Sequence, residues 1–262
     1  MNSSFNNLEV FKHCSLVILN HCPSVTDVSA LSHVREVVID SCLNLADVSG
    51  LGRRNRRVEI VHCDLIKDVS SLGKVRHLIL DFCTGVEDVS ALTHVSYLSL
   101  RGCTEIQDFS GFNSSNQRYL NLTGCEHLED HHLPALADIH ELIISYCNSI
   151  TDISVLRNKR LTARNCSGLT EARLYGDHMI KVDLSNCFEL RRVLIYGNVY
   201  ALRLLETVVE MSSLFVLGSL KYMTGEFEYP NSEESNKINL IDEDELNTDE
   251  GDDYLDDYPE ED

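Results

Sequence analysis

The chain has 262 residues, of which 43% are hydrophobic, and a formal net charge of −20. The length allows one sizeable core, and no apolar run is long enough to predict a membrane-spanning helix. Most of the charge lies at one end, because residues 226–262 hold 17 acidic side chains and one Lys, whereas the rest of the chain has a net charge of −4. A body without concentrated basic surface disfavours direct binding of nucleic acid.

The N-terminal residues 1–14 precede any repeated pattern. They lack a basic segment followed by an apolar one, so we expect no secretory signal. Phe5, Leu8, Val10 and Phe11 provide apolar side chains. We therefore expect residues 1–14 to cover the open end of the core that follows.

Residues 15–207 repeat the frame L-x-L-x-x-C-x-x-I-x-D-V-S-x-L, which is clearest from Leu78 to Ser110. A cysteine marks each turn at intervals of 19 to 22 residues, and an aspartate stands five residues after each of the first seven markers. The markers are Cys22, Cys42, Cys63, Cys83, Cys103, Cys125, Cys147, Cys166 and Cys187, and the aspartates are Asp27, Asp47, Asp68, Asp88, Asp108, Asp130 and Asp152. Such self-similarity predicts a solenoid of nine to ten turns.

This frame resembles the leucine-rich repeat, and its short turns are similar to those of internalins and of many protist or large-virus repeat proteins. The resemblance covers residues 10–207. It implies an α/β-type repeat solenoid, an arc with a parallel β-sheet on its concave face, short convex turns and few helices. It says little about function, because function depends on sites added to a fold.

Each Leu-x-Leu segment predicts a short strand whose first and third residues point inward, from Val17 and Leu19 to Val182 and Leu184. The Asp-Val-Ser-x-Leu segment predicts an extended or 3₁₀ turn, because a 20-residue period leaves no room for a long helix. The longer segment Glu129 to Leu136 could hold a helical turn.

The recurrent cysteines favour a structural interpretation over a metal site or disulfides. No short C-x₂₋₄-C spacing that would indicate a metal cluster occurs. At an inward position a thiol fills space and can donate to a backbone carbonyl. Ten mostly free cysteines suit a reducing compartment, so we expect a cytoplasmic or nuclear location.

The recurrent aspartates could suggest calcium binding, but no glycine-rich loop gathers several oxygens. Capping of backbone N–H groups explains the pattern better. His127, His131 and His132 form a cluster that lacks zinc spacing, and we expect these side chains at the surface. No catalytic motif is present, so we expect no enzymatic activity, cofactor or small-molecule substrate.

The residues that alternate with the inward ones should line the concave face. Aliphatic, aromatic and charged side chains recur there, which is typical of protein-binding surfaces. The candidate binding residues are Val38, Val61, Ile79, Asp81, Phe82, Tyr97, Arg101, Tyr119, Ile143 and Tyr146. Arg53, Arg54, Arg56 and Arg57 form one basic segment that could be an import signal, a docking point for an acidic partner or for the chain's own tail, or a solvated loop.

The repeat fades after Cys187. Apolar residues in 208–224 predict a C-terminal cap, and the acidic composition of 225–262 predicts a disordered tail. The functional hypothesis is a monomeric, non-enzymatic scaffold whose concave face binds another protein, without membrane contact. Two alternatives stay open. One is a substrate-recognition subunit of a ubiquitin ligase, from a resemblance to the repeats of F-box proteins. The other is an acidic-tail chaperone of basic proteins, whose binding would collapse as salt rises.

Overall fold

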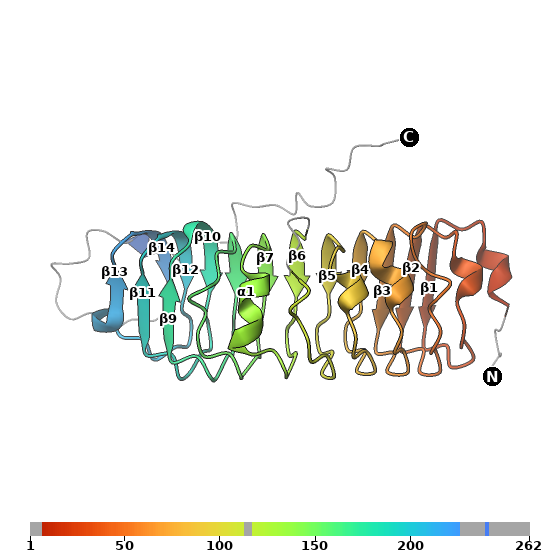
Figure 1. The fold of residues 1–262 in the computed structure, drawn as a ribbon, viewed down its shortest axis with the longest axis horizontal. Coiled ribbons are helices and arrows are strands. Elements are labelled where there is room, and N and C mark those ends of the chain that lie inside the picture. The colour runs from red at the N-terminus through yellow and green to blue at the C-terminus, as the bar shows by residue number, and fades with distance from the viewer. Residues whose placement is uncertain (1–6, 113–116, 226–238, 241–262) are drawn as a thin grey trace.

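The computed structural model describes residues 7–112, 117–225 and 239–240. Figure 1 shows an elongated molecule in which the strands stand side by side along its length. The main sheet has 12 strands in the order β1-β2-β3-β4-β5-β6-β7-β8-β10-β12-β14-β15. They span Leu16–Asn20, Glu36–Asp40, Arg57–Val61, His77–Ile79, Tyr97–Ser99, Tyr119–Asn121, Glu141–Ile143, Arg160–Thr162, Asp177–Asp183, Asn198–Arg203, Ser219–Thr224 and Asn239–Leu240.

Every neighbouring pair in this sheet is parallel, and the register follows the repeat apart from a shift between Asp177 and Met179 in β10. Val17 pairs with Val37, Val37 with Val58, and so on along the molecule. Both inward residues of every predicted strand are buried. The leucine-rich-repeat solenoid with a parallel sheet, short turns and few helices is therefore confirmed.

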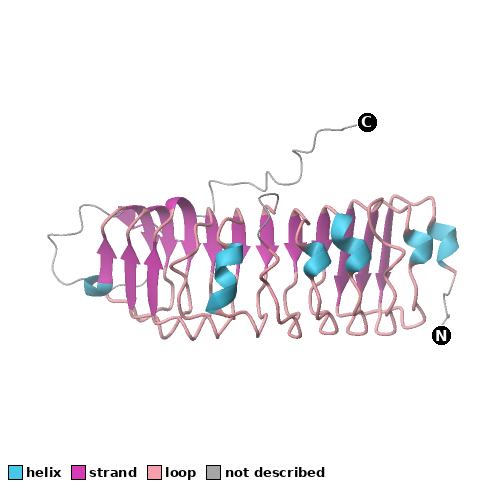
Figure 2. Ribbon diagram, viewed as in Figure 1, coloured by secondary structure: helices cyan, strands magenta, loops and turns pink. Residues whose placement is uncertain are grey.

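The turns opposite the sheet contain short 3₁₀ helices, which Figure 2 shows as separate coils alongside the strands. Val and Leu of the Asp-Val-Ser-x-Leu segment are three residues apart and both buried, as Val28 and Leu31 illustrate. A spacing of three matches the 3₁₀ period. These helices are η1 (Leu8–Phe11), η2 (Ser29–Leu31), η3 (Ser70–Lys74), η4 (Ser90–Leu92), η5 (Asp130–His132) and η6 (Met211–Ser213).

One turn is longer and contains α1 (Leu133–Leu136), the helical turn that the sequence predicts there. The backbone N–H of Glu129 donates to Nδ1 of His132 at 3.2 Å, which caps the start of η5. The imidazole of His132 packs edge-on against Phe109, with ring centroids 5.2 Å apart. The expectation that all three clustered histidines lie at the surface is therefore wrong for His132, because it is buried in this capping role.

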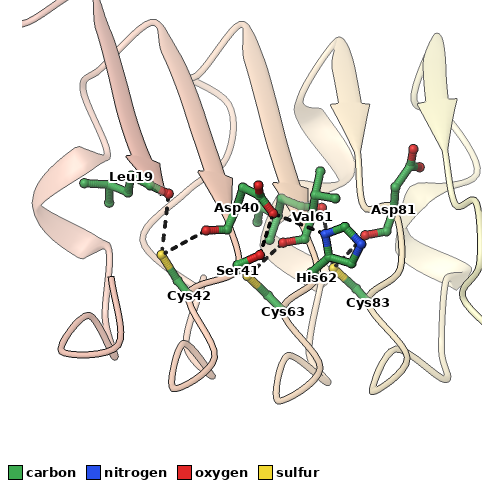
Figure 3. A network of polar contacts seen from close by, with 10 residues as sticks. Leu19, Asp40, Ser41, Cys42, Val61, His62, Cys63, Asp81 and Cys83 are labelled. Carbon is green, nitrogen blue, oxygen red and sulfur yellow. Dashed lines mark hydrogen bonds and ion pairs between the residues drawn. The ribbon is translucent and has the colours of Figure 1, made fainter. Parts of the chain in front are cut away.

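The thiols form a chain of contacts from turn to turn. The Sγ atoms of seven markers donate to the carbonyl oxygen of the second inward residue of the preceding turn, at 2.9–3.5 Å. Figure 3 shows the contact from Cys42 to Leu19. Eight markers are buried, Cys22 is half-buried, and all ten cysteines are free thiols. Burial raises the pKa of Cys63 to about 11 and of Cys103 to about 12.

These environments predict strongly unequal thiol reactivity. At pH 8 a thiol-reactive reagent should modify the exposed Cys14 rapidly and the buried markers only on unfolding, because the thiolate is the reactive form. The measurement is a thiol count over time with and without denaturant. Cys14→Ser should remove the fast phase, and several markers reacting as fast as Cys14 would contradict this packing.

Six of the seven aspartates cap their own turn. Their Oδ1 atoms accept the backbone N–H of the serine two residues later at 2.7–2.9 Å. This hydrogen bond and the serine hydroxyl lower the pKa of Asp88, as in Asp47, Asp68 and Asp108. Asp130 departs from the pattern, because η5 and α1 lengthen its turn. Its carboxylate instead accepts the backbone N–H of Thr151 in the next turn at 2.8 Å.

Replacement of Asp88 tests the capping role. Asp88→Ala should lower the free energy of unfolding by about 1 kcal/mol, the usual net value of one such hydrogen bond. Asp88→Asn keeps the accepting oxygen and should lose less. Glu87→Ala, at the exposed neighbouring position, is the matched control in denaturant titrations. Equal losses for Asp88→Ala and Glu87→Ala would count against the role.

The C-terminal turns replace the 3₁₀ segment with a second, three-stranded sheet of order β13-β11-β9. These strands are β9 (Glu171–Leu174), β11 (Arg192–Ile195) and β13 (Leu214–Val216). Residues 208–224 form a further turn and not a separate cap, because β13 and β14 extend both sheets. The predicted disordered tail 225–262 lies outside the described residues except Gly225 and β15, which pairs with β14.

At the N-terminal end, the described part of the predicted cap is residues 7–14. η1 places Leu8 in the core and Phe11 against it. The side chain of Asn7 accepts the backbone N–H of Glu9 at 3.1 Å, which fixes the start of this helix. Residues 7–14 therefore cover the first turn.

Candidate binding surface

The strand residues that alternate with the buried ones point out of the main sheet on the side away from the core. We call the surface that they form the open face. The register arranges them in three rows that run along the molecule. The first row begins each strand, the second lies two residues later, and the third lies two residues after that.

An aromatic stack occupies the middle of the first row. His77, Tyr97 and Tyr119 follow one another on β4, β5 and β6. The rings of His77 and Tyr97 are 3.9 Å apart and inclined by 15°, and those of Tyr97 and Tyr119 are 4.0 Å apart and inclined by 1°. Each side chain is half-buried, so part of each ring reaches the surface.

Aliphatic side chains border this stack in the next rows. Val38, Ile79 and Ile143 lie in the second row, on β2, β4 and β7, and Val61 lies in the third, on β3. All four are half-buried. Together with the aromatic stack they give the middle of the open face a mixed apolar character.

The charged candidates are held by local hydrogen bonds. Ser99 Oγ and the backbone N–H of Arg101 both donate to Asp81 Oδ1, at 2.5 and 3.2 Å. Burial outweighs these contacts and raises the pKa of Asp81. Arg101 is exposed, and its guanidinium carbon lies 5.2 Å from the ring centre of Phe82. Asp81 and Arg101 therefore present opposite charges side by side.

Phe82 and Tyr146 lie at the rim of the open face and not in its rows. Each precedes a marker cysteine and has a positive φ, 55° and 59°. The ring of Phe82 stacks on His62 at 5.0 Å with an inclination of 6°. Figure 3 shows His62 beside Asp40, whose carboxylate also accepts the Ser41 hydroxyl. These two contacts lower the pKa of Asp40. Tyr146 is 56% exposed.

The structure thus brings eight of the ten candidates together on the open face and places two on its rim. In the first row the sequence reasoning found Tyr97 and Tyr119 but missed His77, Glu141 and Lys181. Period-2 alternation extended one residue before each Leu-x-Leu segment would have found them.

The C-terminal end of the open face differs because it is charged. Asp183 accepts from the guanidinium of Arg164 at 2.6 Å and lies 3.7 Å from that of Arg203. Asp183 and Arg203 are almost fully buried. Burial, followed by the charge of Arg203, lowers the pKa of the nearby Lys181. Arg160 stands next to Lys181 in the first row. We call Arg160, Arg164, Lys181 and Arg203 the basic cluster.

The pKa of His77, in the aromatic stack, should make the stability of the fold depend on pH. Burial and the neighbouring Arg57 lower its pKa to about 4. Between the pKa of about 6.5 in the unfolded chain and the folded value, only the unfolded chain binds the proton. Acidification through this window should therefore destabilise the fold.

Replacing His77 should reduce this acid sensitivity. His77→Phe keeps an aromatic ring without the titration, so its free energy of unfolding should fall less than that of the parent chain between pH 7 and about 4.5. His94→Phe, at an exposed position, is the control. Identical pH dependence of the parent chain and His77→Phe in denaturant titrations would show that His77 does not titrate in this way.

No protein-family model matches the chain, and no curated protein matches it. A solved internalin, InlF of Listeria monocytogenes, is 14% identical with a TM-score of 0.45, over 88% of this chain and 87% of that one. Internalin C2 of the same organism is 19% identical with a TM-score of 0.32, over 75% and 76%.

A third solved structure is the functional domain of InlJ from Listeria monocytogenes, described as including a cysteine ladder. It is 13% identical with a TM-score of 0.30, and the match covers 80% of this chain and 52% of that one. The assignment of this chain as a leucine-rich-repeat solenoid rests on its own repeat and its own parallel sheet.

Among the described residues, no group of three or more His, Cys, Asp or Glu side chains is arranged to hold a metal ion. No helix in the described part of the chain is long and apolar enough to cross a membrane.

Proposed function

We propose that this chain is a non-enzymatic scaffold that binds another protein on the open face, centred on the aromatic stack of His77, Tyr97 and Tyr119. The observation that supports this most directly is the stack itself. Three rings lie in contact on adjacent strands with part of each at the surface. Tyrosine is enriched among residues that dominate binding energy.

Rigidity of the stack favours binding. A side chain that is already ordered loses less conformational entropy when a partner binds. The rings contact one another, and the strands beneath them are hydrogen-bonded along the whole sheet. The stack therefore offers apolar area at a small entropic cost.

The surroundings of the stack fit a protein partner. Ile79 and Ile143 extend the apolar area on either side, and Asp81 and Arg101 lie close by with opposite charges. An apolar centre beside charged groups is the usual composition of a protein–protein interface. Complementary charges on a partner would fix its orientation.

Affinity capture from lysate, with quantification of each captured protein, tests the proposal. A variant carrying Ile79→Glu and Tyr97→Glu should lose the specific partners, because charges would replace the apolar centre. Tyr175→Glu is the matched control, since Tyr175 also stacks on a tyrosine, Tyr196 at 4.6 Å, and is exposed beside the second sheet.

Both variants must first match the parent chain in thermal unfolding. Each captured protein is then purified and its dissociation constant measured for the three chains. Loss of binding only in the Ile79/Tyr97 variant supports the open face as the site. Partners that survive this variant but are lost with Tyr175→Glu would overturn the proposal.

A further inference from the structure

A surface hollow lies on the side of the 3₁₀ helices, between η2, η3 and the turn that separates them. Its eleven lining residues, all in the described part of the chain, include the cations Arg53, Arg54 and Lys74 and no Asp or Glu. Gly50 and Gly52 line it with backbone atoms alone. The hollow is therefore polar and positively charged.

The two arginines come from a local insertion in the repeat. From the buried Leu of a turn to the first inward residue of the next strand, the two flanking turns count six positions, whereas the turn of Arg53 and Arg54 counts seven. The extra residue gives this turn two arginines where the flanking turns have the single side chain of His33 or Lys74. A departure from an otherwise regular pattern is expected at a functional site.

Asn55 anchors the inserted loop from the core side. It is buried, and its Nδ2 donates to the carbonyl oxygens of Leu31 and Val34 at 3.0 and 2.6 Å. Its Oδ1 accepts the backbone N–H of Gly52 at 2.8 Å, and its own N–H donates to the carbonyl oxygen of Gly52 at 2.9 Å. The backbone that carries Arg53 and Arg54 is thus ordered before a ligand binds, which lowers the entropic cost of binding.

The cations of the hollow are not neutralised by neighbouring carboxylates. Arg53 and Lys74 are exposed, and neither forms an ion pair within the described residues. The capping carboxylates of the same turns are Asp47 and Asp68. Hydrogen bonds from the serine two residues later lower the pKa of each, and no basic side chain contributes to either shift. These carboxylates are therefore engaged with their own turns.

A hydroxyl donor completes the hollow. Nη1 of Arg54 lies 2.6 Å from Nε2 of His33, and Nδ1 of His33 lies 2.9 Å from Oγ of Ser32. A guanidinium only donates, so Nε2 accepts and the ring proton is on Nδ1, which donates to Ser32. The hydroxyl hydrogen of Ser32 is then available to an acceptor in the hollow.

These donors suit a phosphate group. A phosphate monoester carries a charge of about −1.5 to −2 at neutral pH and offers three acceptor oxygens. The planar fork of arginine and the compact charge of lysine both bind phosphate oxygens. A carboxylate brings a single charge to three cations, and nucleic acid needs a more extended basic surface than one hollow.

We propose that the hollow bordered by Arg53, Arg54 and Lys74 binds a phosphate group, either free or on a phosphorylated side chain of another protein. The three cations neutralise its charge, and Ser32 donates to one of its oxygens. The site lies on the side of the 3₁₀ helices, away from the open face, and does not rest on the proposed function.

Labelling of Lys74 in the full chain tests the site. An amine-reactive reagent is applied with and without inorganic phosphate, at an ionic strength held constant with chloride, and mass spectrometry gives the rate at each lysine. Phosphate should slow labelling of Lys74 several-fold, because the ligand covers its amine. The rate at Lys67, which is exposed and outside the hollow, should not change.

Variants that match the parent chain in thermal unfolding identify the residues involved. Arg53→Gln should remove most of the protection of Lys74 by phosphate, and Ser32→Ala should remove a smaller part. Arg118→Gln is the matched control, because Arg118 is also exposed and its replacement changes the net charge equally.

A second measurement distinguishes the source of the phosphate. Fluorescently labelled Gly-Ser-Gly peptides are compared with the serine phosphorylated, unmodified or replaced by Glu. The phosphorylated peptide should bind several-fold more tightly than the Glu peptide, and inorganic phosphate should displace it. Tighter binding of the phosphorylated peptide than of inorganic phosphate indicates a phosphorylated protein as the source, and equal affinity indicates free phosphate.

Unchanged labelling of Lys74 in phosphate would overturn the inference. Equal loss of protection in Arg53→Gln and Arg118→Gln would do the same, because it would show a general effect of charge. So would equal binding of the phosphorylated and Glu peptides. None of these measurements involves the open face, so their failure leaves the proposed function untouched, and failure of the capture experiment leaves the phosphate site standing.

Discussion

The whole solenoid depends on one residue per turn that takes the left-handed backbone conformation. It directly precedes each marker cysteine, with φ between 51° and 71° from His21 to Glu206, which holds the equivalent place after the last marker. Its backbone N–H still donates to the following turn, as from Phe82 to Arg101 at 2.6 Å. The chain can therefore leave the strand and turn toward the core without losing a sheet hydrogen bond.

This conformation is costly for residues other than glycine, by about 1–2 kcal/mol. Only Gly102 and Gly124 avoid that cost among these positions. The others include Asn165 and Asn186, which tolerate it best, and none is β-branched. At Gly102 a side chain is also excluded by space, because a Cβ would lie 2.4 Å from the ring of Phe82. The hydrogen bond to the next turn and the buried thiol that follows hold the strained residue in place.

The same constraint shapes the binding surface. A left-handed residue projects its side chain to the rim of the open face, where His62 and Phe82 stack and Tyr146 stands exposed. Within the strands, the register places equivalent residues of successive turns next to one another. Aromatic residues at equivalent positions of three turns therefore become the stack of His77, Tyr97 and Tyr119.

The sequence predicted the elements whose signal repeats, since periodic apolar residues report directly on burial. The inward pairs follow from a spacing of two residues and the 3₁₀ turns from a spacing of three. The helical turn that ends at Leu136 follows from the longer segment there. Departures from the repeat were not predictable in this way. Asp130 changes its hydrogen-bond partner and His132 becomes buried because two added residues lengthen one turn. Residues 208–224 lack the cysteine, yet β14 still continues the sheet, because Leu220 and Met223 retain inward positions.

The two ends of the solenoid are covered in different ways, and the open face differs accordingly. At the first turn, η1 buries Leu8 against the core and leaves the outward residues Leu16 and Ile18 exposed. At the last turns, the buried outward residues other than Ala201 are charged or polar, and β15 extends the sheet edge through backbone hydrogen bonds. An edge strand protects itself against unwanted pairing when charge surrounds it. The charged side chains at this end of the open face therefore oppose unwanted pairing at the last strands, whereas at the first turn η1 and the packing of Leu8 cover the end of the core.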